Sequence, residues 1–142
     1  MVCRLVRPGT TRVVDTSTDL DRLTDFFDHF GAAVTAGDMP ALSACFALPS
    51  MVVADGYSFA FSTPAAVVLS FLGAVPDYQH RQIVASHARV RRDRQVSAAL
   101  VAVEVEWEYL DARGRAVPGR QFHYLLRLGR DGVRICTVTP LD

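Results

Sequence analysis

Two titratable side chains, His123 and Asp55, occupy sequence positions that suit proton transfer. His123 stands between Phe122 and Tyr124 in a strand-like segment, and a neutral imidazole in an apolar enclosure can act as an acid or a base near neutral pH. Asp55 lies just before a run of aromatic residues, where desolvation would raise the pKa of its carboxyl group. We therefore predict His123 and Asp55 as the candidate catalytic residues.

Each candidate also has a purely structural alternative. The hairpin turn that precedes His123 pairs Val103 with Phe122, which directs His123 outward. One residue absorbed as a bulge at Pro118–Gly119 would pair Val103 with His123 instead and direct the imidazole inward. The sequence leaves both orientations open. Asp55 and the glycine after it also form a common turn pair, which is a sufficient reason for an aspartate there.

Other pairs of titratable residues are weaker indications of a catalytic or metal site. Asp25 and His29 are four residues apart on an expected helix, which fits either an acid–base pair or an exposed surface pair. His80 and His87 are an odd number of residues apart on an expected strand, so they point to opposite faces and do not share a metal ion. The cysteines show no CxxC spacing and are expected to be free thiols. We predict no metal site and no cofactor.

The charge balance argues against nucleic-acid and membrane partners. The chain of 142 residues has 15 basic and 15 acidic residues, so no overall field attracts a phosphate backbone or an anionic lipid surface. No apolar run is long enough to cross a bilayer, and the first residues lack the apolar stretch of a signal peptide. We predict a cytoplasmic protein that binds neither nucleic acid nor membranes.

Three helices are expected in the first half of the chain. Residues 1–17 are predicted to be an N-terminal extension, and residues 18–142 one domain. The first helix runs from Thr18 to Gly37, because its apolar residues recur at helical spacing: Leu20, Leu23, Phe26, Phe27, Phe30 and Val34. Asp38 caps a second helix that Pro49 ends, and a third helix runs from Pro64 to Pro76.

The remaining segments alternate as strands do. A short strand at residues 51–54 turns into an aromatic strand at residues 57–61, and four strands follow at residues 79–92, 96–110, 115–128 and 133–139. Strands this long must twist and curl. We therefore predict an α+β fold in which a cone-shaped, curved antiparallel sheet packs against three N-terminal helices and encloses an apolar pocket. Its expected lining is Phe30, Tyr57, Phe59, Phe71, Trp107 and Tyr109.

Two stretches carry a family resemblance: AAVTAGDMPALSACFALPSMVV at residues 32–53 and YLLRLGRDGVRICTVTP at residues 124–140. They resemble the nuclear transport factor 2-like superfamily, which includes ketosteroid isomerases, SnoaL-like polyketide cyclases, scytalone dehydratase and limonene epoxide hydrolase. The resemblance extends from residue 18 to the C-terminus and implies the cone-shaped fold. It also implies a homodimer, since members commonly pair through the outer face of the sheet.

The resemblance implies no single activity, because this fold supports many. Counted without gaps, the tyrosine of the isomerase oxyanion hole falls on Phe30, the general-base aspartate on Ala54 and the second oxyanion-hole aspartate on His123. Steroid isomerase chemistry of that type is therefore not expected. An epoxide hydrolase would need an Asp, Arg, Asp relay, of which Asp55 and Arg127 are an incomplete match.

The leading hypothesis is a protein that binds a small apolar molecule in the cone and acts as a cofactor-free isomerase, cyclase or dehydratase. The alternative is a ligand carrier or homodimeric association domain without catalysis. A row of glutamates, Glu104, Glu106 and Glu108, is expected on the outer sheet face, where it meets water, a second copy, or arginines such as Arg120 or Arg127.

Overall fold

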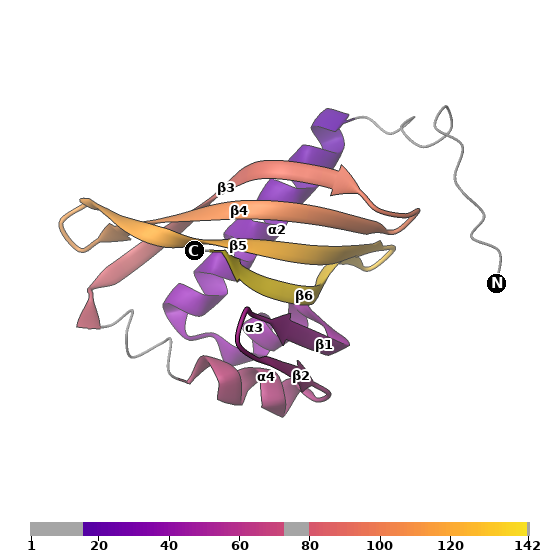
Figure 1. Cartoon of the computed structure of the whole chain (residues 1–142). Helices are drawn as coiled ribbons and strands as arrows, with labels where there is room; N and C mark the ends of the chain where they lie inside the picture. The colour runs from indigo at the N-terminus through magenta and orange to yellow at the C-terminus, as the bar shows by residue number, and fades with distance from the viewer. Residues whose placement is uncertain (1–15, 73–79, 142) are drawn as a thin grey trace.

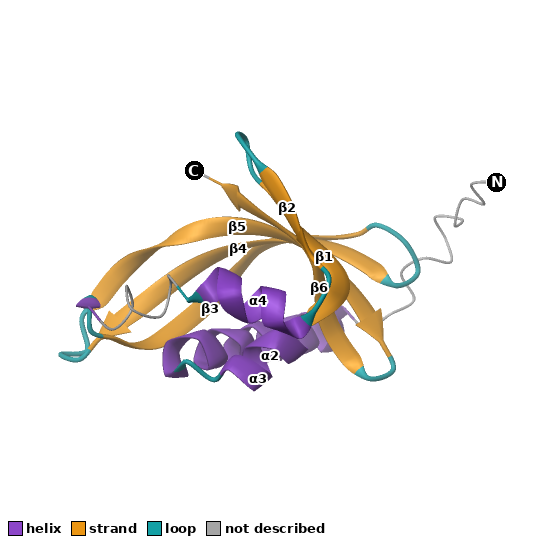
Figure 2. Ribbon diagram, turned by 90° about the horizontal axis from the view of Figure 1, so that it is seen from below, coloured by secondary structure: helices purple, strands orange, loops and turns teal. Residues whose placement is uncertain are grey.

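A curved sheet, whose concave face is covered by helices, forms the protein (Figures 1 and 2). The computed structural model describes residues 16–72 and 80–141. The helices are α2 (Thr16–Ala36), α3 (Met39–Ala44) and α4 (Pro64–Phe71). The strands are β1 (Phe46–Val53), β2 (Ser58–Phe61), β3 (Ile83–Gln95), β4 (Leu100–Asp111), β5 (Ala116–Gly129) and β6 (Gly132–Leu141). The predicted α+β class is confirmed.

The strands form one six-stranded sheet in the order β2-β1-β6-β5-β4-β3. Strands β3 to β6 follow one another as antiparallel neighbours, as expected for strands joined by short turns. Strand β1 differs, because it lies parallel to β6, the last strand of the chain. This parallel pair connects the β1–β2 hairpin to the rest of the sheet.

Helix α2 ends where the sequence predicts. Gly37 adopts a φ of 68°, a left-handed conformation that glycine accepts without strain. The amides of Gly37 and Asp38 donate to the carbonyl oxygens of Val34 and Ala33 at 3.2 and 2.9 Å, which is the usual way to satisfy the last carbonyls of a helix. Asp38 then accepts a hydrogen bond from the amide of Ala41 at 3.2 Å and caps α3.

Helix α3 is shorter than predicted. It ends at Ala44, and strand β1 begins at Phe46, so Pro49 lies inside a strand instead of ending a helix. The reason is a tertiary hydrogen bond: the amide of Ile135 on β6 donates to the carbonyl of Cys45 at 2.8 Å. Helix α4 begins as predicted, with Thr63 as its N-cap, but the predicted continuation to Pro76 lies outside the described residues.

The register between β4 and β5 decides which residues face the helices. The predicted bulge is present, because Gly119 and Arg120 together lie opposite Trp107. The hairpin turn also shifts the pairing by one residue, because Leu110 pairs with Ala116 and not with Arg115. The amide of Asp111 donates to the carbonyl of Arg115 at 3.0 Å within this turn. Together the turn and the bulge shift the pairing by two residues, so the residues of β5 keep the face that the unshifted pairing would give them. Val103 therefore pairs with Tyr124, and neither pairing considered from the sequence occurs.

Glycine is required at position 119. A Cβ atom built there would collide with the backbone oxygen of Trp107 and lie 2.7 Å from Cε2 of Tyr109. A backbone atom cannot give way as a flexible side chain can. The bulge therefore brings two strands into close contact that any larger residue would separate.

We expect Gly119→Ala to lower the free energy of unfolding by about 1–3 kcal/mol, the usual cost of overpacking. Gly56→Ala is the matched control, because a Cβ atom at Gly56 would meet nothing within 4 Å; we expect its effect to stay within ~0.5 kcal/mol. Urea unfolding of both variants measures the difference. Equal stability of the two variants would contradict the close contact.

The β4–β5 turn is organised by the carboxylate of Asp111. One carboxylate oxygen accepts hydrogen bonds from the amides of Arg113 and Arg115, both at 2.9 Å, and the other accepts one from Nε of Arg115 at 3.1 Å. The backbone hydrogen bond from Arg115 is the largest cause of a lowered pKa for Asp111. The charged form of this side chain therefore favours the folded state.

A pH series tests this role. Because the folded pKa of Asp111 is lowered, its contribution is present above the pKa of the unfolded chain, about 4, and is lost as pH falls through the lower folded value. We expect Asp111→Asn to have a lower urea midpoint than wild type at neutral pH, with the gap closing in acid. Asp131→Asn, in the β5–β6 turn, controls for the lost charge. A gap independent of pH would contradict the interpretation.

Candidate functional site

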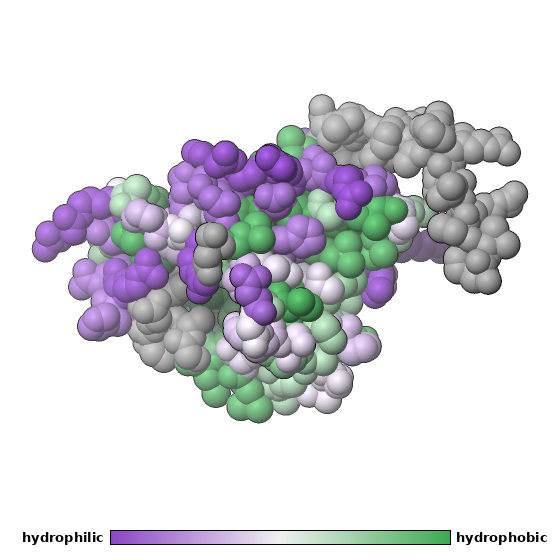
Figure 3. Space-filling view, viewed as in Figure 1, coloured by the Kyte–Doolittle hydropathy of each residue, from purple (hydrophilic) through white to green (hydrophobic). Residues whose placement is uncertain are grey.

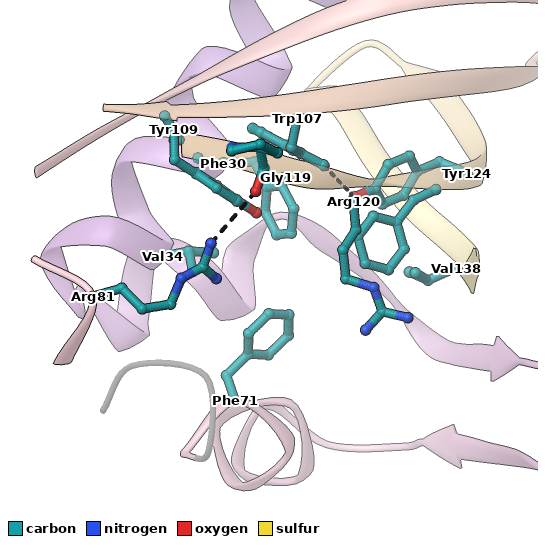
Figure 4. A pocket seen from close by; sticks show the side chains of 14 residues that line it. Phe30, Val34, Phe71, Arg81, Trp107, Tyr109, Gly119, Arg120, Tyr124 and Val138 are labelled. Carbon is teal, nitrogen blue, oxygen red and sulfur yellow. Dashed lines mark hydrogen bonds between the residues drawn. The ribbon is translucent and has the colours of Figure 1, made fainter. Parts of the chain in front are cut away.

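An apolar cavity of about 360 Å³ lies between the helices and the inner face of the sheet. Helices α2 and α4 form one side, and strands β3 to β6 form the other (Figure 4). The lining residues are Phe30, Gly31, Val34, Phe71, Arg81, Ser86, Trp107, Tyr109, Pro118, Gly119, Arg120, Phe122, Tyr124 and Val138. The structure thus brings together Phe30, Phe71, Trp107 and Tyr109 of the predicted lining.

Tyr57 and Phe59, also predicted to line the pocket, lie elsewhere. They are 58% and 42% exposed, because the β1–β2 hairpin extends past the helices that cover the sheet (Figure 2). Their rings stack on each other with centroids 6.0 Å apart. Only the next alternating residue, Phe61, reaches the core, where it is 3% exposed. The prediction that Tyr57 and Phe59 line the cavity is therefore corrected.

His123 lies on the outer face of the sheet. It pairs with Glu104 on β4, while its neighbours Phe122 and Tyr124 line the cavity on the inner face. His123 itself borders a shallow depression formed with residues 92–94. The pairing of β4 with β5 explains this position, because it places Tyr124 opposite Val103 and His123 opposite Glu104. His123 therefore cannot transfer a proton to or from a molecule in this cavity.

Asp55 lies in the exposed β1–β2 turn. The turn is closed by a hydrogen bond from the amide of Ala54 to the carbonyl of Tyr57 at 2.8 Å, and Asp55 is not part of the cavity lining. The prediction that Asp55 transfers protons in the cavity is therefore corrected: the residue belongs to the turn, which was the structural alternative. Asp25 and His29 are both exposed on α2, which matches the surface-pair alternative.

A buried hydrogen bond between Trp107 and Tyr124 forms the inner wall of the cavity. The indole Nε1 of Trp107 donates to the hydroxyl oxygen of Tyr124 at 3.0 Å (Figure 4). The two side chains are 4% and 3% exposed. An indole nitrogen only donates, so the tyrosine oxygen is the acceptor. The hydroxyl hydrogen of Tyr124 is therefore directed elsewhere.

Tyr124 stays protonated at neutral pH. Burial raises its pKa well above the usual tyrosine range; the bond from Trp107 opposes this shift, and Tyr109 adds to it. Among the described residues the hydroxyl of Tyr124 has no acceptor, and its side chain lines the cavity. Tyr124 thus presents a neutral hydrogen-bond donor to whatever occupies this space.

Two arginines line the same cavity. The guanidinium of Arg81 lies 5.7 Å from the ring centre of Tyr109, and that of Arg120 lies 5.7 Å from the ring centre of Phe122. Arg81 also donates from Nη2 to the carbonyl of Pro118 at 3.4 Å. Within the described part of the lining there is no carboxylate and no imidazole. The two guanidinium groups and the Tyr124 hydroxyl are the hydrogen-bond donors that these side chains bring to the cavity.

The sequence interpretation did not include Tyr124, Arg81 or Arg120 in the pocket. One signal for two of them was available: Arg120, Phe122 and Tyr124 alternate along β5 and share a face. Which face points inward depends on the register, which alternation alone does not define. Arg81 precedes β3, and no periodic pattern marks it.

Cys45 is a buried, unreactive thiol. It is 3% exposed, and burial raises its pKa to about 11 despite the opposing effect of Arg134. A protonated thiol is a poor nucleophile and a poor metal ligand. Within residues 16–72 and 80–141, no group of three or more His, Cys, Asp or Glu side chains could hold a metal ion.

The outer face of the sheet carries the glutamate row. Glu106 pairs with Arg89 at 3.3 Å and Arg91 at 3.1 Å, and Glu108 pairs with Arg89 at 2.9 Å. These cations come from β3 and are neither of the two arginines named from the sequence, Arg120 and Arg127; Arg120 lines the cavity on the opposite face.

Hydrophilic side chains gather over β3 and β4 in the space-filling view, and hydrophobic ones over α4 (Figure 3). No helix of the described residues combines the length and apolar character needed to cross a membrane. The homodimer stays a prediction.

Comparison with known proteins shows which family the chain matches. A family model described as NTF2-like protein (DUF6841) matches residues 20–142. No protein with a curated description matches the chain.

Solved structures share the fold at low sequence identity. Aln2 from a Streptomyces species is 10% identical with a TM-score of 0.68, and the match covers 91% of this chain and 94% of Aln2. An NTF-2 like protein of unknown function from Shewanella oneidensis is 14% identical with a TM-score of 0.64, covering 87% and 99%. A ketosteroid isomerase-like protein from Erwinia carotovora atroseptica is 17% identical with a TM-score of 0.58, covering 87% and 97%.

Proposed function

Because the chain belongs to the family of NTF2-like proteins, we propose that it binds a small, largely apolar molecule in the cavity lined by Trp107 and Tyr124. The observation that carries this proposal is the Tyr124 hydroxyl, a buried neutral donor that is held by Trp107 and has no acceptor among the described residues. A buried donor without an acceptor is unfavourable. A ligand oxygen would satisfy it.

The cavity suits an aromatic or alicyclic body. Its volume of about 360 Å³ falls within the range of roughly 300–1,000 Å³ that small-molecule sites occupy. Phe30 and Phe71 on the helical side and Trp107 on the sheet side offer ring faces and edges to a ligand. Apolar contact supplies affinity, and the hydroxyl of Tyr124 supplies orientation.

The acceptor on the ligand is best provided by a carbonyl oxygen. Tyr124 has a raised pKa and donates without being ionised, so it pairs with a neutral acceptor at little electrostatic cost. The described lining offers no carboxylate or imidazole to remove a proton from the ligand. We therefore favour binding, as in a carrier, over an isomerase, cyclase or dehydratase, each of which needs a proton acceptor in the site.

Filling the cavity should weaken ligand binding. Val138 lines the cavity, and the added ring of Val138→Phe would occupy space that the ligand needs. We expect isothermal titration with 2-acetylnaphthalene to show at least a ~10-fold loss of affinity. Thr139→Phe is the matched control, since the next residue of the strand pairs with His123 on the outer face. Equal binding by both variants would place the ligand outside this cavity.

Removing the phenolic hydroxyl should weaken only ligands that carry an acceptor. We expect Tyr124→Phe to lower affinity for 2-acetylnaphthalene by roughly 2- to 10-fold, which corresponds to one hydrogen bond. Affinity for 2-ethylnaphthalene, which lacks the carbonyl group, should change much less. The difference between the two ligands separates the hydrogen bond from any general loss of stability. An equal loss for both would contradict the role of Tyr124 as a donor.

A further inference from the structure

We propose that the molecule bound in this cavity carries an oxyanion group, and that Arg81 and Arg120 bind this group at the outer end of the site. The inference rests on the proposed function, because it concerns the ligand of the same cavity. It also gives the ligand an orientation: the apolar part points toward Trp107 and Tyr124, and a carboxylate or phosphate group points toward solvent.

Burial along the lining defines these two ends. Phe30, Trp107 and Tyr124 are 5%, 4% and 3% exposed, whereas Arg120 is exposed and Arg81 is partly exposed. Arg81 and Arg120 extend from two sides toward the space above Phe71 (Figure 4). A charged group is costly to bury but can remain partly hydrated at the outer end. The ligand anion therefore belongs beside the arginines and not beside Tyr124.

The packing of each guanidinium suits recognition of an oxyanion. Arg81 lies over the ring of Tyr109 and Arg120 over the ring of Phe122. Both distances, 5.7 Å from the guanidinium carbon to the ring centre, are within the range of cation–π attraction. With five donors, a guanidinium can bond to protein groups and to a ligand at the same time. The contacts with the rings thus help to hold both cations at the cavity.

The charges of the sheet are sorted between its two faces. The glutamates of β4 all project from the outer face, where Glu106 and Glu108 pair with Arg89 and Arg91. The inner face contributes Arg120 to the cavity, and the described lining contributes no carboxylate. Arg81 and Arg120 each take part in further interactions within the protein, so a ligand oxyanion would share their N–H donors with protein groups.

The test compares matched ligands on the full-length protein. Isothermal titration with 2-naphthoate and with its methyl ester at neutral pH isolates the charge, because the two share the aromatic body. A titration with 2-naphthyl phosphate distinguishes the two anion classes. We expect at least one anion to bind wild type ~10-fold more tightly than the ester, the usual gain from charge-assisted hydrogen bonds. Added salt should weaken the anion and not the ester.

Single substitutions test whether Arg81 and Arg120 bind the anionic group. We expect Arg81→Gln and Arg120→Gln each to weaken the preferred anion by about 10-fold and the ester by less than ~2-fold. Arg113→Gln, an exposed position in the β4–β5 turn, removes the same charge away from the lining and should leave both affinities within ~2-fold. Thermal unfolding reports whether each variant is folded, and the comparison of ligands on wild type needs no variant at all.

The outcomes separate the two proposals. If the ester binds wild type as tightly as both anions, or if the arginine variants weaken ester and anion equally, the oxyanion inference is wrong and the proposed binding function stands. If neither the ester nor either anion binds wild type, both proposals fail. Preference for one anion, lost in Arg81→Gln and Arg120→Gln but not in Arg113→Gln, supports the inference.

Discussion

The pairing of β4 with β5 is the constraint on which the candidate site depends. One extra residue in the turn held by Asp111 and one in the bulge at Gly119 together shift the pairing by two positions. Because side chains alternate between faces, a shift of two preserves the inner face while a shift of one would reverse it. Tyr124 thereby meets Trp107 inside the cone, and His123 stays outside.

The same pairing distributes charge. Glu106 and Glu108 of β4 project outward to the arginines of β3, whereas Trp107 and Tyr109 on the opposite face of β4 line the cavity. Arg120 shares the inner face of β5 with Tyr124. An apolar chamber with a neutral donor at its inner end and cations at its outer end follows from alternation along two strands.

Much of the fold could be predicted from the sequence because its signals are local. The apolar stripe of α2, the cap at Asp38 and the stop at Gly37 depend on residues within a few positions of one another. The end of α3 could not be predicted in this way. Strand β1 begins at Phe46 because Cys45 is bonded to Ile135, a partner distant in the sequence.

The sequence by itself determined the class of the fold, the order of its elements and four aromatic residues of the cavity, Phe30, Phe71, Trp107 and Tyr109. These follow from periodicity, which is a property of neighbouring residues. Only the tertiary structure decided that Tyr124 faces inward, that His123 faces outward and that the Tyr57 ring lies beyond the helices. Strand register and helix coverage are set by contacts between distant segments, and alternation along one strand is compatible with either face.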